Sequence, residues 1–476
     1  MGTIIKGGRV VTASDSFEAD VRIDGEKITA IGKNLEAGNG DETIDANGRW
    51  IIPGGIDPHV HLELPFMGTI SKDDFDTGTQ CALAGGTTTL IDFAIPPKGE
   101  SMLKIIDDWD AKAKDKARCD YTYHAAVTDW NDQIAEEIPR VVKERGINSF
   151  KIFLAYYGVF GLNDDEAFRV VRAVKEAGGI VLVHAVNGNV LTAMATEMIA
   201  NGQGEPIYHA LSQPPEAEGE ATGRIIRFTE IENGSVYIVH TTAIDALEEI
   251  NAGRQRGKAT VLGETCTQYF FLNQDLYELP NWEGAKYVLS PPLRPKEHSE
   301  ALWKALNNHT IETIGTDHCS FDYNGQKNLK GTLPDGTPFD ATKDFRFIPN
   351  GFNGIEERLM MMYTYGVKDG RISPERWVAT CCTNAAKVFG LWPRKGTIAV
   401  GSDADIVLWD PDCSGTISAK THKSAADYNV YEGYEIRGRA TTTFVRGKVA
   451  YRDGEVLAEP GSGRFLKRGP FSAHSI

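Results

Sequence analysis

Short apolar segments alternate with helical segments through the middle of the chain, and this alternation limits the possible folds more than any other feature. Amphipathic helical patterns such as 101–117 and 164–178 separate most of the apolar segments. Eight segments have the length and β-branched character of buried strands: 56–61, 87–93, 121–127, 149–155, 180–184, 235–240, 260–266 and 312–317. This order predicts an α/β fold, a (β/α)8 TIM barrel.

The two ends of the chain share a different sequence pattern, in which Gly and Asp interrupt short runs of β-branched residues. Neither end has enough strands to bury a core alone. We therefore expect residues 1–52 and 396–455 to form one small β-sandwich domain, with the barrel inserted as residues 53–395. Residues 456–476 lack a regular pattern and are expected to form a C-terminal arm, either frayed or packed against a neighbouring subunit.

The composition excludes several classes of protein. The 476 residues include 50 Lys and Arg against 66 Asp and Glu, a formal charge of −16, so nucleic acid and anionic membranes are poor partners. The 7 cysteines lack C-x-x-C spacing, which favours a reducing compartment over a disulfide framework. We find no secretory signal, no membrane-spanning apolar run and no Gly-rich phosphate loop after a strand, and expect a cytoplasmic protein.

Titratable residues end four of the expected strands. His59 and His61 end the first, and strand alternation places them on one face about 6.5–7 Å apart. His184, His240 and Asp317 each close another apolar run. Because barrel enzymes carry their chemistry at the C-terminal ends of strands, these five side chains are expected to converge. They suit Zn²⁺ and are too many for one open tetrahedral site, so the sequence predicts two metal ions.

Lys151 lies within a strongly apolar strand, SFKIFLAYY. As an ammonium it would repel the cations and lose its hydration. As a neutral amine it can add CO₂ and form a carbamate whose two oxygens bridge both metals. A lysine whose head reaches water, or pairs with a buried acid, is the alternative; the surrounding ligand set favours the carbamate.

The sequence resembles the dihydropyrimidinase and hydantoinase family of cyclic amidohydrolases over essentially its whole length. The segments that carry the resemblance are DPHVHLELPFMGT, SFKIFLAYYG, GETCTQYF, YVLSPPLR, GTDHCSF and IPNG, with the strand ends at His184 and His240. The resemblance implies that His59, His61 and Asp317 hold one Zn²⁺, with Mn²⁺ or Co²⁺ as alternatives. His184 and His240 would hold the other, and N6-carboxylysine at Lys151 would bridge the two.

The same resemblance implies roles for residues around the metals. Asp317 would transfer the proton during catalysis, and Tyr156 would donate its phenol to the developing oxyanion. Ser290 and Asn350 would hold the amide edge of the substrate, largely through main-chain groups. Apolar side chains would line the pocket for the ring substituent, with ordinary core packing as the alternative for each: Leu64, Phe66, Phe153 and Phe160.

The resemblance implies hydrolysis of dihydropyrimidines (dihydrouracil and dihydrothymine) and 5-substituted hydantoins to N-carbamoyl amino acids, as in pyrimidine catabolism, by a homotetramer or homodimer. Glu63 stands where a dihydroorotase carries the arginine that pairs with the substrate carboxylate, and a glutamate there would repel it. A non-catalytic scaffold relative would lack metal ligands, whereas all six are present here. Allantoinase is the main alternative.

Overall fold

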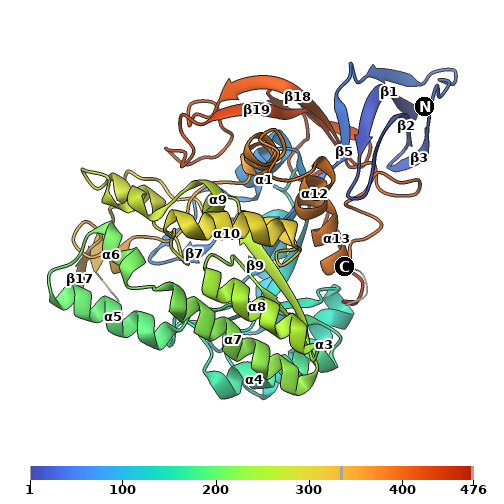
Figure 1. Ribbon diagram of the computed structural model, residues 1–476. Coiled ribbons are helices and arrows are strands. Elements are labelled where there is room, and N and C mark those ends of the chain that lie inside the picture. The colour runs from blue at the N-terminus through green and yellow to red at the C-terminus, as the bar shows by residue number, and fades with distance from the viewer. Residues whose placement is uncertain (1, 333–335, 473–476) are drawn as a thin grey trace.

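The computed structural model describes residues 2–332 and 336–472, and its centre is a barrel of eight parallel strands (Figure 1). In sheet order these are β6 (Gly55–Val60), β9 (Thr87–Ala94), β10 (Asp120–Ala126), β11 (Ser149–Phe153), β12 (Ile180–His184), β13 (Ser235–Ile238), β14 (Thr260–Cys266) and β15 (Thr313–Gly315). The two edge strands meet where the His61 amide donates to the His318 carbonyl at 2.7 Å and the Asp317 amide donates to the His59 carbonyl at 2.9 Å. The predicted barrel is confirmed, with all of its strands.

Helices follow most barrel strands and cover the barrel's outside. In chain order they are α1 (Phe75–Ala84), α2 (Met102–Ala113), α3 (Asp132–Arg140), α4 (Asp164–Glu176), α5 (Gly188–Ala200), α6 (Pro206–Leu211), α7 (Pro215–Glu232), α8 (Ile244–Arg256), α9 (Gln268–Phe271), α10 (Lys296–Asn307), α11 (Arg358–Met362), α12 (Pro374–Val378) and α13 (Asn384–Val388). In α4 the buried residues Ala167, Val170, Val171 and Val174 recur at helical spacing, and Asn163 caps its start. No helix in the described part of the chain is both long and apolar enough to cross a membrane.

Shorter elements complete the connections. The 3₁₀ turns are η2 (Gln274–Glu278), η3 (Glu283–Tyr287) and η4 (Phe345–Phe347), and the π turns are η1 (Val141–Arg145), η5 (Tyr363–Val367) and η6 (Ala379–Thr383). Two small antiparallel ribbons pair β7 (Pro65–Phe66) with β8 (Thr69–Ile70) and β16 (Lys330–Thr332) with β17 (Pro338–Asp340).

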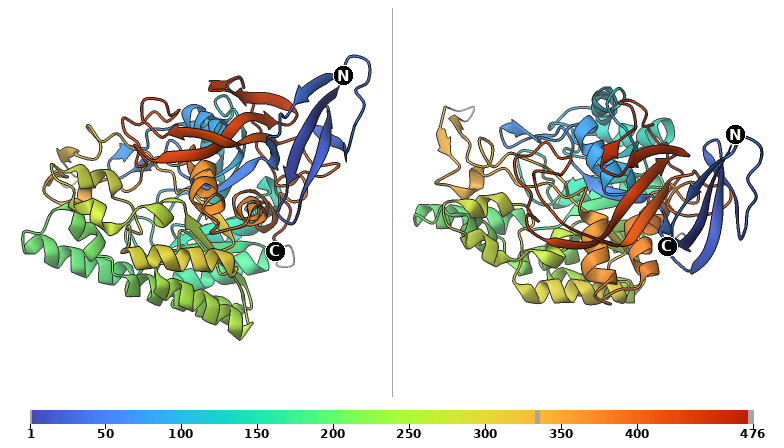
Figure 2. Two further views of the ribbon diagram at one scale, coloured as in Figure 1. Left: turned by 45° about the horizontal axis from the view of Figure 1, so that its top comes forward. Right: turned by 90° about the horizontal axis from the view of Figure 1, so that it is seen from above.

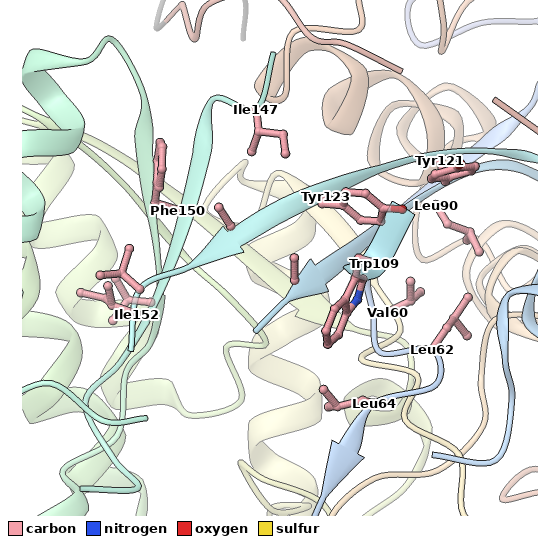
Figure 3. Packing of buried hydrophobic residues seen from close by; sticks show 14 of the residues in the cluster. Val60, Leu62, Leu64, Leu90, Trp109, Tyr121, Tyr123, Ile147, Phe150 and Ile152 are labelled. Carbon is pink, nitrogen blue, oxygen red and sulfur yellow. The ribbon is translucent and has the colours of Figure 1, made fainter. Parts of the chain in front are cut away.

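Strand alternation separates two apolar layers of the barrel. On β10 and β11, Tyr121, Tyr123, Phe150 and Ile152 belong to the same buried cluster as Trp109 of α2 (Figure 3). Residues between them, such as Lys151, take the opposite face and point into the barrel. The period-two pattern of the sequence therefore decides which polar side chains reach the interior.

The two ends of the chain join in one sheet beside the barrel (Figure 2). Its nine strands are β1 (Gly2–Val11), β2 (Ser16–Asp24), β3 (Lys27–Gly32), β4 (Glu42–Asp45), β5 (Trp50–Pro53), β18 (Ile406–Thr416), β19 (Glu435–Val445), β20 (Lys448–Arg452) and β21 (Glu455–Val456). β5 pairs antiparallel with β18, which joins the N-terminal strands to the C-terminal ones. Their shared core draws on both ends, with Val10 and Val21 from one, and Ile406 and Phe444 from the other. The expectation that both ends build one β domain is confirmed.

The described part of the C-terminal arm packs on the barrel of its own chain. The Leu466 amide donates to the Tyr121 carbonyl at 2.7 Å, and the Tyr121 amide donates to the Arg464 carbonyl at 3.0 Å. Arg468 is buried and donates to the Tyr123 carbonyl. Neither sequence interpretation of the arm anticipated this contact. Residues 473–476 lie outside the described residues.

A buried lysine links the barrel to the sheet domain. The Lys395 ammonium is 1% exposed and lies 2.7 Å from Asp120, 2.6 Å from Asp405 and 3.1 Å from Asp403. Asp120 begins β10, whereas Asp403 and Asp405 immediately precede β18. The arm joins the same group, because the Arg464 amide donates to the Asp120 carboxylate at 3.0 Å.

The Lys395→Met variant removes the cation from this group and leaves the carboxylates buried without it. We expect a loss of about 3–5 kcal/mol in the free energy of unfolding, measured by urea denaturation. Lys104→Met is the matched control, because Lys104 forms an exposed i,i+4 pair with Asp108; its effect should stay within about 0.5 kcal/mol. Equal effects of the two substitutions would contradict the structural role of Lys395.

Candidate metal centre and substrate pocket

The titratable residues that end the barrel strands do come together. His59 Nε2 and His61 Nε2 each lie 3.1 Å from Asp317 Oδ1. The ligand atoms of His59, His240 and Asp317 all lie within 4.8 Å of one another. His184 Nδ1 lies 2.8 Å from His240 Nε2. The structure therefore places two groups of possible ligands side by side at the C-terminal mouth of the barrel, one around Asp317 and one between His184 and His240.

Three residues of this region have a left-handed backbone, which side chains other than glycine rarely adopt: Asp317 at φ +54°, His240 at φ +37° and Tyr156 at φ +61°. The backbone around Asp317 is fixed by its neighbours. Its amide donates to the His59 carbonyl, and the adjacent Thr316 hydroxyl donates to Asp57 at 2.7 Å. Such strain persists where the surroundings hold it and tends to cluster at functional sites.

Lys151 is 1% exposed and points into the barrel from β11. Its Nζ lies 4.9 Å from the centre of the Phe93 ring. Within the described residues it forms no ion pair with a carboxylate. Burial lowers the pKa of this amine to about 8. A lysine that reaches water or pairs with an acid, the alternative considered from sequence, is not what the structure contains.

Burial also sets the protonation of the histidines. It lowers the pKa of His61 to about 4 and that of His184 to about 3, so both rings are neutral at physiological pH. At His59, burial opposes protonation, but Glu264 and Asp317 outweigh it and raise the pKa to about 9. Neutral imidazoles are the form that binds metals.

Glu264 is a site residue that sequence reasoning missed. It lies on β14 and is 0% exposed. Its Oε1 is 2.6 Å from His59 Nδ1 and accepts from the His240 amide at 3.0 Å, and its Oε2 accepts from the Tyr237 hydroxyl at 2.8 Å. A carboxylate behind a histidine fixes the ring's orientation and directs the other nitrogen outward. The available signal was an acid inside the apolar strand TVLGETC.

The donor atoms fit a centre of two divalent ions. His184 Nδ1 and His240 Nε2 face each other at 2.8 Å, and a cation between neutral rings would satisfy both lone pairs. The second group combines two imidazoles with the Asp317 carboxylate, a set suited to Zn²⁺ and similar ions. The buried Lys151 lies on β11, next to the strand β12 that ends at His184, and lines the same cavity as the histidines and Asp317.

A cavity of about 920 Å³ opens above these residues. All seven residues that the sequence assigned to substrate contact line it: Leu64, Phe66, Phe153, Tyr156, Phe160, Ser290 and Asn350. Phe160 joins the aromatic wall, with its ring centre 4.7 Å from that of Phe153 and 5.0 Å from that of Tyr156. Further apolar side chains extend the wall from α2 and α5, among them Trp109 and Leu191.

Polar groups form a second part of the cavity lining. The Tyr156 phenol lies beside Ser290 and Asn350, and burial raises its pKa. Asn350 Oδ1 is buried and, across the described chain, has no hydrogen-bond partner. Ser290 Oγ donates to Gln213 Oε1 at 3.1 Å. An unpaired acceptor at a pocket wall is suited to a ligand's N–H group.

His209 and Gln213 also line the pocket, although the sequence gave neither a role. His209 Nε2 donates to the Leu289 carbonyl at 2.7 Å, which supports the segment next to Ser290. Two other buried histidines have polar partners of their own: His124 Nδ1 lies 2.6 Å from Ser149 Oγ, and His318 Nε2 lies 3.0 Å from Asp73 Oδ2.

The expectation that Glu63 repels a substrate carboxylate is wrong. Its carboxylate lies 2.8 Å from Lys116, on the side of α2, and it does not line the pocket. Glu63 therefore cannot repel a substrate carboxylate directly. An arginine, Arg346, does line the pocket, but it is paired with Asp344 at 2.6 Å. No unpaired arginine therefore faces the pocket among the described residues.

The chain is similar to several known proteins over nearly its whole length. The amidohydrolase family matches residues 50–450. A D-hydantoinase of Geobacillus stearothermophilus is 47% identical over 473 residues, 99% of this chain and 98% of that protein. A dihydropyrimidinase of Rattus norvegicus is 40% identical over 98% of this chain and 89% of that one. The crystal structure of a dihydropyrimidinase from Brevibacillus agri is similar with a TM-score of 0.95 and 46% identity, covering 99% of this chain and 100% of that chain.

The Glu264→Gln variant should weaken metal binding, because the amide holds the His59 ring less firmly than the carboxylate does. We expect the affinity to fall about 10–100-fold, measured as metal occupancy in chelator-buffered solutions. Glu230→Gln is the control, since Glu230 is also a buried acid but pairs with Arg256 on the barrel's outside. Unchanged occupancy in Glu264→Gln would show that the carboxylate does not support the site.

Proposed function

The chain belongs to the amidohydrolase family, and we propose that it opens the cyclic amide of dihydropyrimidines and 5-substituted hydantoins by hydrolysis. The products are N-carbamoyl-β-amino acids and N-carbamoyl-α-amino acids, respectively. The observation that carries this proposal is the convergence of six possible metal ligands beneath a pocket with one apolar and one polar wall. The relatives compared above are named hydantoinase and dihydropyrimidinase, which does not favour the allantoinase alternative.

We propose two divalent ions, Zn²⁺ in preference to Mn²⁺ or Co²⁺. His59, His61 and Asp317 would hold one ion and His184 and His240 the other, with carboxylated Lys151 shared between them. Such ions would lower the pKa of a bound water and polarise the substrate carbonyl. The absence of an acid partner for Lys151 supports the carbamate, since the neutral amine that adds CO₂ is favoured by burial.

Asp317 is the proposed proton carrier. Burial acts to raise its pKa, but His59 and His61 outweigh this and hold the pKa well below its ordinary value. The carboxylate is therefore ionised at neutral pH and can accept a proton from the attacking water. It returns that proton to the ring nitrogen as the C–N bond breaks, so that the ring opens to a single N-carbamoyl amino acid, with the carboxylate on one side of the broken bond and the carbamoyl NH₂ on the other.

Tyr156 and the two polar segments orient the ring. The Tyr156 phenol stays protonated because burial raises its pKa, so it can donate to the oxygen that becomes negative. Ser290 and Asn350 lie beside it and would bind the amide edge. The substituent then projects towards the aromatic wall formed by Phe66, Phe153 and Phe160. The homotetramer or homodimer and the cytoplasmic location expected from sequence stay predictions.

Lys151→Ala should abolish hydrolysis and lower the metal content from close to two ions per chain, because no other side chain supplies the bridging oxygens. Lys151→Arg should fail equally, since guanidinium stays protonated and cannot add CO₂. Elemental analysis and intact mass under native conditions are the measurements. An active wild-type protein with an unmodified amine, or with one ion per chain, would contradict the bridged centre.

The preferred substrates should be neutral rings. We expect kcat/KM for dihydrouracil, or for an alkyl- or aryl-hydantoin, to exceed that for dihydroorotate at least tenfold (about 1.4 kcal/mol), because the only arginine that lines the described pocket is already paired. Allantoin, which is polar at the substituent, should also be poor. An aryl group buried against the aromatic wall adds about 1–3 kcal/mol at roughly 25 cal/mol per Å².

The corresponding control separates the pocket from the metal centre. Phe66→Ala should change the ratio of kcat/KM between benzylhydantoin and hydantoin while the metal content stays the same. The panel consists of dihydrouracil, hydantoin, allantoin and dihydroorotate. If dihydroorotate or allantoin is the best substrate, the substrate assignment is refuted. If none of the four is hydrolysed, the proposed function is refuted.

A further inference from the structure

Lys327 is a completely buried lysine outside the metal centre. It lies in the loop that follows β15, is 0% exposed, and forms no ion pair with a carboxylate within the residues the structure describes. Its Nζ donates to two main-chain carbonyls instead, that of Val288 at 2.9 Å and that of Pro349 at 2.6 Å. Burying an amine among carbonyls is unfavourable unless they are held in place to receive it.

The two carbonyls belong to the two segments that carry the polar wall of the pocket. Val288 is two residues before Ser290, and Pro349 directly precedes Asn350. The segments also touch each other, because the Gly351 amide donates to the Val288 carbonyl at 2.9 Å. Lys327 therefore joins the two segments through hydrogen bonds. Ser290 and Asn350, one from each segment, line the pocket.

We propose that Lys327 is a positioning residue that sets the spacing between Ser290 and Asn350. Through this spacing it would determine how tightly the protein binds the amide edge that all substrates share. This inference rests on the proposed function. Lys327 itself does not line the pocket and so acts through the two segments. Burial lowers its pKa to about 7, but a neutral amine keeps two N–H groups, enough for both carbonyls in either protonation state.

The neighbouring residue extends the same loop to the apolar wall. Gln326 Nε2 donates to Thr69 Oγ1 at 2.7 Å and to the Ile70 carbonyl at 2.8 Å. Thr69 and Ile70 form β8, which pairs with the strand that carries Phe66. One loop thus holds the amide-binding segments through Lys327 and the substituent-binding ribbon through Gln326.

Because Lys327 contacts the amide-binding segments and not the apolar wall, its substitution should change KM and kcat in a pattern that a loss of stability alone would not give. The amide edge is held in both the ground state and the transition state, so loosening it should raise KM more than it lowers kcat. The increase should be the same for every ring, whatever its substituent. A change at the apolar wall should instead alter the ratio between rings.

The test compares Lys327→Met with wild-type holoenzyme on dihydrouracil, hydantoin and benzylhydantoin. We expect KM to rise about tenfold for all three rings, with kcat within about threefold and the metal content unchanged. Lys327→Gln keeps two N–H donors on a shorter side chain and should give an intermediate KM, a partial rescue. Phe66→Ala should alter the ratio of KM values between rings instead.

Val174→Ala is the control for stability, because Val174 is buried in α4, away from the pocket. At a comparable loss of melting temperature it should leave KM unchanged. Two results for Lys327→Met would overturn the inference: an unaltered KM, or a KM change confined to one substituent. In either case, turnover by the wild-type protein would still support the proposed function. If Lys327→Met does not fold, Lys327→Gln decides, and a wild-type KM in that variant counts against the inference. Wild-type protein inactive on all three rings would instead refute the proposed function.

Discussion

The burial of ionisable groups at the mouth of an apolar barrel is the constraint on which the rest of the structure depends. Lys151, His59, His184 and His240 are each 3% exposed or less. Groups buried to this degree must be neutral, paired or bound to a cation. Glu264 meets part of this requirement by facing His59 and the His240 amide at once. Among the described residues, His59 Nε2 and His184 Nε2 are buried without a hydrogen-bond partner, so the donor set suits a metal ion better than a self-contained core.

The hydrogen bonds that close the barrel also hold the candidate metal ligands next to one another. The hydrogen bonds that join the edge strands run between His61 and His318 and between Asp317 and His59, residues that are themselves ligand candidates or their neighbours. The left-handed backbone of Asp317 is imposed at this seam. A barrel that failed to close would leave Asp317 free to relax and would separate it from both histidines. The fold thus holds the strained backbone of Asp317 at the place where chemistry is proposed.

The sequence predicted what local patterns determine. Period-two alternation located the barrel strands and placed Lys151 inside, and the turn-rich ends indicated one shared β domain. Local patterns did not reveal the roles of four residues, because each contacts residues that are distant in the sequence: Glu264, His209, Gln213 and Lys327. Glu264, for example, contacts His59, which is 205 residues away. Glu63 was misjudged for a related reason. Its position two residues after His61 suggested the pocket, but a left-handed backbone at φ +50° turns its side chain towards Lys116.

The division of the pocket into two walls has a consequence for how selectivity can change. The polar wall comes from the segments around Ser290 and Asn350, whereas the apolar wall comes from the β7–β8 ribbon and the segment around Phe160. In the proposed function, the polar wall would bind the amide that every substrate shares, and the apolar wall would bind the substituent that distinguishes one ring from another. Because the two walls lie on separate parts of the chain, substitutions in the ribbon can change the space for the substituent while leaving the segments around Ser290 and Asn350 unaltered. The loop at Gln326 and Lys327 contacts both walls, but through different residues: Gln326 bonds to the ribbon, and Lys327 bonds to the segment that carries Ser290.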